Sequence, residues 1–448
     1  MTASTQRQRV LIVAYAFPPT GGVGVQRVTK FVKYLPRFGW DVSVLTPSNP
    51  SVPLLDSSWS ADVPADALIC RARTFEPPYA VKDLISGARG ARDARAAWMP
   101  SGARHVLRGI ASRVLQPDPQ VLWFPAAVRE GRRLLHSVPH AAILATAPPF
   151  SCLLIGAALQ RASGLPLVLD YRDEWDLASR FQENKRFGPV VRRLNRSIER
   201  RIVRRACAIL ATTDASARSL EAIRDRAGGQ ALVRRIRNGF DPDDFARTGP
   251  VPGAEPRSRY RVTYTGTLWN LASVRPLVEA IDRLGRQAPG LAARLEVVLA
   301  GRRTADQEAL LARLSGLPVE VVRHPYLPHA AIVDLMRAAD LLCLLKTTVP
   351  GAERSVNAKV FEYMAARRPI LAIAPRGELW QVLDDYPSVD RFEPADVDGI
   401  SAFLARRLAA FDAATVAPAI EWDGARYDRR HQAKELADVL ASVSPVGD

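Results

Sequence analysis

The residues best suited to chemistry stand between Ser355 and Glu362, in the run SVNAKVFE. A helix capped by Ser355 would present the amides of its first turn, which includes Asn357, and the positive end of its dipole to a diphosphate. Glu362 lies about 6 Å further along the axis than Ala358, at about 1.5 Å per residue, where its carboxylate can accept from both ribose hydroxyls. An ordinary surface pair of Lys359 with Glu362 is the alternative.

A second candidate phosphate site is the loop Gly21-Gly22-Val23-Gly24. Its small residues stand where a strand is expected to pass into a helix, so backbone amides can approach a phosphate closely. The loop is not a dinucleotide fingerprint, because the required third glycine is replaced by Arg27. A plain tight turn is the alternative.

No protein-built metal site is expected. Asp241-Pro242-Asp243 has the spacing of a DxD metal signature, but it follows Asn238-Gly239 in a turn-rich segment. The six histidines form no paired-ligand spacing such as HExxH. We therefore predict that the protein uses neither a metal nor another cofactor.

These residues must be positioned by strands that alternate with amphipathic helices along the whole chain. That alternation predicts an α/β protein with parallel, doubly wound sheets. In the first half, strands are expected at 10–15, 42–46, 67–72, 141–145, 166–170 and 207–211. In the second half, they are expected at 261–265, 295–300, 319–323, 340–345 and 369–373.

The stretch 248–258 holds three prolines and two glycines, which predicts an interdomain linker. The expected division is an N-terminal domain over 1–247, a C-terminal domain over 259–422, and a last helix within 423–448 that packs back on the N-terminal domain.

The composition excludes small stapled scaffolds and disordered chains, because 448 residues are 48% hydrophobic and 24% charged. Residues 1–240 hold 36 Lys and Arg against 18 Asp and Glu, whereas the remainder is nearly neutral. Four widely spaced cysteines without a CxxC predict reduced core thiols, and the first residues do not read as a signal peptide. A cytoplasmic location is expected.

Four segments in the same order resemble glycosyltransferase family 4. They are FPPTGGVGVQRVTKFVKYL, RNGFDPDDF, YTGTL and AKVFEYMAARRPILAI. PPF and DYRDEW (148–150 and 170–175) are similar to its cell-surface polysaccharide and exopolysaccharide branch. The resemblance covers essentially the whole chain. It implies the GT-B fold, two Rossmann-like domains facing each other across a cleft, with a nucleoside-diphosphate sugar on the C-terminal domain, the acceptor on the N-terminal domain, and retention of anomeric configuration.

The same resemblance assigns roles to single residues. Glu362 matches the ribose-binding glutamate, and Lys359 matches a basic residue beside the diphosphate. Gly22, with its neighbours, matches the glycine loop that faces the donor phosphate. The remaining matches are Arg172 and Asp173, in a loop that approaches the transferred sugar, and Gly266 and Thr267, in the glycine loop of the second domain.

Two departures from the family pattern concern charge. Many relatives carry an acidic residue eight positions before the ribose-binding glutamate, but that position is Arg354, with Glu353 one place off register. The stretch after the second glycine loop, Leu268 to Ala272, lacks the usual basic residue. Arg354, Lys346 and Arg302 are the candidates to neutralise the leaving diphosphate in its place.

Two basic amphipathic stretches, 105–115 and 190–203, lie in the N-terminal half. In the second, Val190, Leu194, Ile198 and Ile202 are expected on one face, opposite arginines. Docking on an anionic membrane surface, at the inner face of the membrane, is one interpretation. A crossover helix with solvated arginines is the other for 190–203.

The sequence thus predicts a retaining glycosyltransferase that acts on a polyprenyl-diphosphate-linked or other glycan. A nucleotide-sugar epimerase of similar fold is an alternative. A second alternative is a basic nucleic-acid-binding protein, but the basic residues lack interleaved aromatic side chains and no nucleic acid is expected as a partner.

Overall fold

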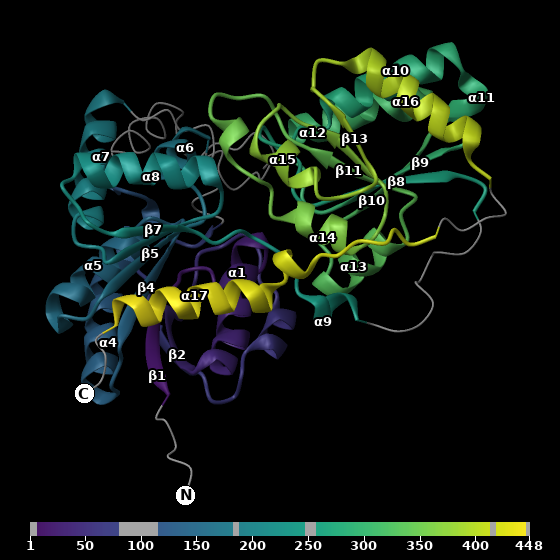
Figure 1. The fold of residues 1–448 in the computed structure, drawn as a ribbon. Coiled ribbons are helices and arrows are strands. Elements are labelled where there is room, and N and C mark those ends of the chain that lie inside the picture. Colours follow the sequence, from purple (N-terminus) through teal and green to yellow (C-terminus); the bar gives the residue numbers. More distant parts are fainter. Residues whose placement is uncertain (1–6, 80–114, 182–187, 247–256, 413–417, 445–448) are drawn as a thin grey trace, which may run out of the picture. The chain divides into compact units, whose positions relative to one another are not determined.

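The computed structural model describes residues 7–79, 115–181, 188–246, 257–412 and 418–444. The chain forms two compact units, each with a parallel sheet between helices (Figure 1). One unit comprises residues 1–238 and 429–448, and the other comprises residues 239–428. Each is an α/β unit of the doubly wound kind, as the alternation of strands and helices predicts.

The N-terminal unit has a seven-stranded parallel sheet in the order β3-β2-β1-β4-β5-β6-β7. The strands are β1 (Gln8–Val13), β2 (Trp40–Pro47), β3 (Leu68–Ala72), β4 (Ala142–Ala147), β5 (Leu167–Tyr171), β6 (Ala208–Ala211) and β7 (Leu232–Arg235). Its α-helices are α1 (Val23–Tyr34), α4 (Phe124–Ser137), α5 (Ser151–Ser163), α6 (Trp175–Phe181), α7 (Pro189–Val203), α8 (Asp214–Arg226) and α17 (Arg429–Val443). Its 3-10 helices are η1 (Leu35–Phe38), η2 (Ser57–Asp62) and η4 (Pro119–Trp123).

The C-terminal unit has a six-stranded parallel sheet in the order β10-β9-β8-β11-β12-β13. The strands are β8 (Tyr260–Thr265), β9 (Leu295–Ala300), β10 (Glu320–His324), β11 (Leu341–Leu345), β12 (Ile370–Ile373) and β13 (Val389–Phe392). Its α-helices are α9 (Pro242–Phe245), α10 (Arg275–Gln287), α11 (Pro289–Ala292), α12 (Ala305–Leu311), α13 (His329–Arg337), α14 (Lys359–Ala365), α15 (Glu378–Leu383) and α16 (Val397–Ala410). Its 3-10 helices are η6 (Ala312–Gly316), η7 (Ala352–Arg354) and η8 (Ala425–Tyr427).

The strands form because their residues are apolar on both faces, as a sheet covered on both sides requires. In β1, Leu11 and Val13 point into a core shared with α4 and α5, while Val10 and Ile12 point into a core shared with α1 and α17. The sequence missed β7 and β13, since these edge strands are short and carry charged residues.

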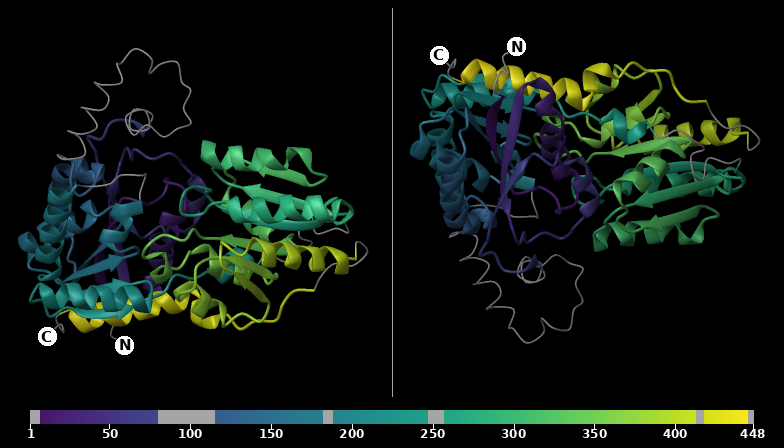
Figure 2. Two further views of the ribbon diagram at one scale, coloured as in Figure 1. Left: turned by 90° about the horizontal axis from the view of Figure 1, so that it is seen from above. Right: turned by 90° about the horizontal axis from the view of Figure 1, so that it is seen from below.

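The C-terminal helix α17 belongs to the N-terminal unit. It lies along α1 in Figure 1 and beside the same unit in both views of Figure 2, and it buries Ala433, Leu436 and Leu440 in the core that holds Phe31. The chain thus returns to its first unit at Arg429, later than the segment start predicted at 423.

The first crossing between the units lies at Asn238 and Gly239, before the predicted boundary at 247. The physical reason is local: the Phe240 amide donates to the Tyr427 carbonyl at 3.0 Å, and the Phe240 ring packs on Phe245 and Trp422. Most of the predicted linker at 248–258 lies outside the described residues.

Among residues that the structure describes, no helix is both long and apolar enough to span a membrane. All four cysteines are free thiols, and Cys152 and Cys343 are buried as expected. The prediction of a core position was wrong for Cys207, which is exposed because it precedes β6 rather than lying within it.

A buried ion pair ties the N-terminal unit together. The Arg27 guanidinium on α1 donates to the Asp170 carboxylate on β5 at 2.9 Å, and the two side chains are 2% and 0% exposed. Asp170 also accepts from the Thr146 hydroxyl at 2.8 Å, and Arg27 donates to the Arg237 carbonyl at 2.9 Å. Arg27, the residue that stands in place of the third glycine of the fingerprint, therefore forms with Asp170 a network that connects α1, β4, β5 and the segment after β7.

We predict that Arg27→Met lowers the free energy of unfolding by about 3–5 kcal/mol, because it leaves the Asp170 carboxylate buried without its cation. Urea unfolding followed by circular dichroism measures the change. Arg9→Met is the matched control, since Arg9 pairs with a partly exposed Asp41 and its loss should cost about 1 kcal/mol or less. Equal losses for both variants would contradict the prediction.

Candidate functional site

The candidate residues of the C-terminal unit gather at the carboxyl ends of its strands. Gly266 and Thr267 follow β8, Arg302 follows β9 and Lys346 follows β11. The sheet order reverses between β8 and β11, and ligands of open parallel sheets bind outside such a reversal. Topology alone thus brings together residues that are far apart in the sequence.

The glycine loop after β8 is shaped by Lys359. The Lys359 ammonium donates to the Thr265 carbonyl at 2.7 Å and to the Tyr264 hydroxyl at 2.9 Å, and it lies 4.1 Å from the centre of the Tyr264 ring. Gly266 has a φ of +118°, and a Cβ there would lie 2.4 Å from the Lys359 nitrogen. Only glycine fits the loop while Lys359 occupies this place.

Burial lowers the pKa of Lys359 to about 7, while the nearby Glu362 carboxylate acts in the opposite direction. Tyr363, one turn further along α14, accepts from the Thr265 amide at 2.9 Å. Lys359 and Tyr363 thus fasten α14 to the end of β8, which fixes Glu362 between them. Tyr264 and Tyr363 lie in the motifs YTGTL and AKVFEYMAARRPILAI, but the sequence analysis assigned neither a role, because the contacts of their hydroxyls join residues distant in the chain.

The expectation that Ser355 caps a helix was wrong. The helix α14 begins at Lys359, its N-cap is Ala358, and Ser355 is extended with a φ of −107°. The Ser355 hydroxyl instead accepts from the Lys346 ammonium at 3.0 Å. Asn357 precedes the helix and accepts the Val360 amide through its carbonyl at 3.1 Å.

The three candidate cations differ in their surroundings. Lys346 is 7% exposed, and its ammonium donates to both oxygens of Ser355. Arg354 is half-buried in η7, and Arg302 is exposed beside the glycine loop, where its carbonyl accepts the Leu268 amide at 2.8 Å. The off-register Glu353 carboxylate accepts the amide of Gly351 in its own loop at 3.0 Å.

Glu362 is 9% exposed and has a partner that the sequence did not indicate. His329 Nε2 lies 2.7 Å from Glu362 Oε1. His329 is the first residue of α13 and Glu362 lies on α14, with β11 between the two helices in the chain. His329 matches no metal or catalytic spacing. Only the fold brings this pair together.

In the N-terminal unit, the candidate residues meet where the sheet order reverses between β1 and β4. The Arg172 guanidinium donates to the carbonyls of Gly24, Ala147 and Pro148. A Cβ on Gly24 would lie 3.2 Å from Arg172 Nη1. Arg172 thus links the loops after β1, β4 and β5, while Asp173 beside it is exposed.

The other two glycines of the first loop meet different constraints. Gly22 caps α1 with a φ of +94°, which favours glycine. A Cβ on Gly21 would lie 2.9 Å from the Leu54 side chain.

Burial lowers the pKa of Arg172, whereas the nearby Asp170 and Asp173 carboxylates act to raise it.

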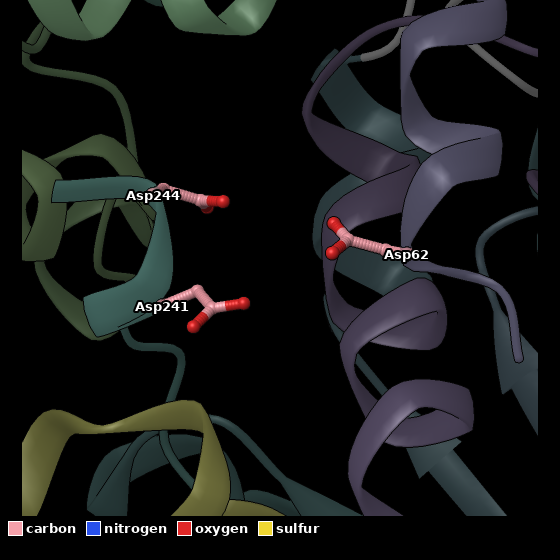
Figure 3. Close-up of side chains that lie close together, drawn as sticks. All are labelled: Asp62, Asp241 and Asp244. Carbon is pink, nitrogen blue, oxygen red and sulfur yellow. The ribbon is translucent and has the colours of Figure 1, made fainter. Parts of the chain in front are cut away.

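Asp241, the first carboxylate of the DxD spacing, has a structural role. Asp241 caps α9, with its Oδ1 accepting the Asp243 amide at 3.0 Å, and Asp244 lies on the same helix (Figure 3). Asp62, also labelled in Figure 3, belongs to the N-terminal unit and pairs with Lys30 at 2.7 Å and Lys33 at 3.1 Å. Within the part of either unit that the structure describes, no three potential ligands gather around one point.

Two family models match the chain. Residues 21–239 match the glycosyl transferase 4-like domain, and residues 259–403 match glycosyl transferases group 1. The chain is a family-4-like glycosyltransferase. Neither model describes an epimerase or a nucleic-acid-binding protein, so the matches support neither alternative. Comparison with curated protein sequences returns no match.

Solved structures share the fold at low identity. The sucrose-phosphate synthase of Thermosynechococcus elongatus is 14% identical over 98% of this chain and 95% of its own, with a TM-score of 0.57. Anabaena HepE in complex with UDP-glucose is 15% identical over 97% and 99%, with a TM-score of 0.59. WaaG, a glycosyltransferase involved in lipopolysaccharide biosynthesis, is 13% identical over 97% of both chains, with a TM-score of 0.54. The glycosyltransferase therefore has the two-domain GT-B fold.

We predict that sugar-nucleotide binding at pH 8 takes up close to one proton per molecule bound. Lys359, with a pKa of about 7, is mostly neutral at that pH, and a diphosphate beside it would raise the pKa and draw in a proton. Calorimetric titration of the tightest-binding member of a set of UDP-, GDP- and dTDP-sugars, in buffers of different ionisation enthalpy, measures the uptake, with Lys359→Met as the control that abolishes it. A binding enthalpy independent of the buffer would contradict the prediction.

Proposed function

We propose that the enzyme is a retaining glycosyltransferase that moves a sugar from a nucleoside-diphosphate sugar to a hydroxyl of a glycan. The observation that carries the proposal is the arrangement on α14, where Lys359 lies under the glycine loop and Glu362 follows within one turn. An ammonium for a diphosphate and a carboxylate for a ribose diol are what a sugar nucleotide needs. The binding of UDP-glucose by HepE supports the same class of donor.

The chemistry proposed requires stabilisation of the departing diphosphate. Lys359, with one or more of Lys346, Arg302 and Arg354, supplies positive charge in a preorganised site, so no metal is required. The acceptor hydroxyl then attacks the anomeric carbon from the face that the leaving group vacates and gives its proton to the departing diphosphate, which retains the configuration. In this proposal Gly21, Gly22 and Gly24 serve the donor phosphate, while Arg172 holds the loops that place Asp173 near the sugar.

Glu362→Gln is predicted to weaken sugar-nucleotide binding by about 1.5–3 kcal/mol, the range for a hydrogen bond to a charged group. Calorimetric titration with UDP-, GDP- and dTDP-sugars, in EDTA throughout, measures binding and identifies the donor. Glu393→Gln is the control, since Glu393 is exposed and pairs with Arg376. Unchanged affinity of Glu362→Gln would contradict the assignment of Glu362 to the ribose. Binding that requires added Mg2+ or Mn2+ would contradict the proposal that no metal is needed.

Turnover distinguishes the proposal from epimerisation. A transferase consumes the donor fully only when an acceptor is present, whereas an epimerase converts it without one. The anomeric configuration of the product, read by nuclear magnetic resonance, tests retention directly.

We further propose that the acceptor is lipid-linked and that the N-terminal unit docks on the inner face of an anionic membrane. The stretch 105–115 lies outside the described residues, apart from Leu115, so the support comes from α7. The prediction that α7 buries an apolar face was wrong in part. Asn195 and Glu199 are buried, while Val190 is 75% exposed and Leu194 is 47% exposed. The exposed arginines of this helix are Arg192, Arg193, Arg196, Arg200 and Arg201.

We predict that the double variant Val190→Ser, Leu194→Ser reduces co-sedimentation with anionic phosphatidylglycerol vesicles at physiological salt. The arginines contribute about 1 kcal/mol each near such a surface, but salt screens that attraction, whereas insertion of apolar side chains persists. Leu55→Ser is the control, because Leu55 is similarly exposed, at 62%, outside α7. Equal partitioning of wild type and double variant would remove α7 as the anchor, and no partitioning would favour a soluble acceptor.

A further inference from the structure

The His329 imidazole stands between two carboxylates of the C-terminal unit. Its Nε2 lies 2.7 Å from Glu362 Oε1, and its Nδ1 lies 3.8 Å from Asp244 Oδ2. The His329, Glu362 and Asp244 side chains are 13%, 11% and 19% exposed. The helices α9, α13 and α14 thus contribute one residue each to a cluster of three largely buried ionisable side chains.

The hydrogen bond to Glu362 has a defined direction. An ionised carboxylate only accepts, so the proton must lie on His329 Nε2, and 2.7 Å is the length of a charge-assisted bond. The Asp244 carboxylate lies 3.8 Å from Nδ1, which is beyond hydrogen-bond distance, on the other side of the ring. His329 is thereby held as a donor toward Glu362.

This bond restricts the orientation of the Glu362 carboxylate. The last torsion of a glutamate side chain is broad, so a carboxylate without a partner samples many orientations of its plane. A ribose offers two adjacent hydroxyls at fixed spacing, and a carboxylate accepts from both only when its plane is aligned with them. Fixing Oε1 leaves Oε2 with one narrow range of positions.

We propose that His329 is a positioning residue that orients Glu362 for the ribose diol, and so sets the preference for ribonucleotides over 2′-deoxyribonucleotides. The inference rests on the proposed function, since it assumes that Glu362 contacts the ribose of the donor. His329 itself need not touch the ligand. Asp244 supports it from the opposite side of the ring.

The test compares nucleoside diphosphates with their 2′-deoxy counterparts. The full-length chain is titrated calorimetrically with UDP, GDP and ADP, and the tightest of these is then paired with its 2′-deoxy form. The variants are His329→Leu, His329→Gln, Glu362→Gln and the double variant His329→Leu, Glu362→Gln. His431→Leu is the control, since His431 is 52% exposed on α17.

We expect His329→Leu to weaken ribonucleotide binding about tenfold, which corresponds to about 1.4 kcal/mol, while binding of the 2′-deoxy form changes little. His329→Gln should retain most of the affinity, because its amide can donate to Glu362. The double variant should bind no more weakly than Glu362→Gln alone, since both changes remove the same interaction.

The outcomes separate this inference from the function on which it rests. If wild type binds none of the nucleotides, both fail. If Glu362→Gln weakens binding but His329→Leu does not, only the positioning role fails. If His329→Leu weakens the ribose and 2′-deoxyribose forms equally, its effect is a general one on the unit, and the inference is overturned. Thermal unfolding of each variant shows whether the fold is kept.

Discussion

The buried pair of Arg27 and Asp170 is the interaction on which the N-terminal unit depends. Two charges removed from water must satisfy each other and their neighbours, and here Thr146 and the Arg237 carbonyl complete the set. The pair holds α1 against β5 and therefore fixes where the glycine loop at the start of α1 stands. The same strand continues into Arg172, whose guanidinium joins that loop to the loop after β4.

The C-terminal unit uses a desolvated cation for a comparable purpose. Lys359 loses water but gains the Thr265 carbonyl, the Tyr264 hydroxyl and the Tyr264 ring. These contacts do not remove the cost of burying a charge, so its pKa falls to about 7. A lysine whose charged form is so destabilised is stabilised strongly when an anion binds beside it, which is the property that a diphosphate site needs.

The role of a charged side chain in this enzyme depends on its position in the fold, and the net charge of each half of the chain does not reveal it. The excess of arginine and lysine in residues 1–240 includes Arg27 and Arg172, which are engaged inside the fold, and the arginines of α7, which face solvent. The nearly neutral C-terminal unit carries the cations proposed to act on the donor. Net charge therefore says less about function than the partners of each side chain do.

The sequence by itself determined the strands other than β7 and β13, the doubly wound class and the order of the motifs, because a sheet covered on both faces needs continuous apolar runs and such runs are visible locally. It also selected Lys359, Glu362 and the glycine loop at 21–24, since their spacing along the chain is short, whereas Gly266 and Thr267 were implied only by the family resemblance. It could not find His329 beside Glu362, Tyr264 beside Lys359 or Asp170 beside Arg27, because each pair joins elements that are distant in the chain. It misplaced the start of α14, where Ser355 contacts Lys346 instead of capping the helix, and the buried face of α7, where the Asn195 amide donates to Gln116. Those outcomes depend on which elements the tertiary structure packs together, and so on interactions that no short stretch of sequence contains.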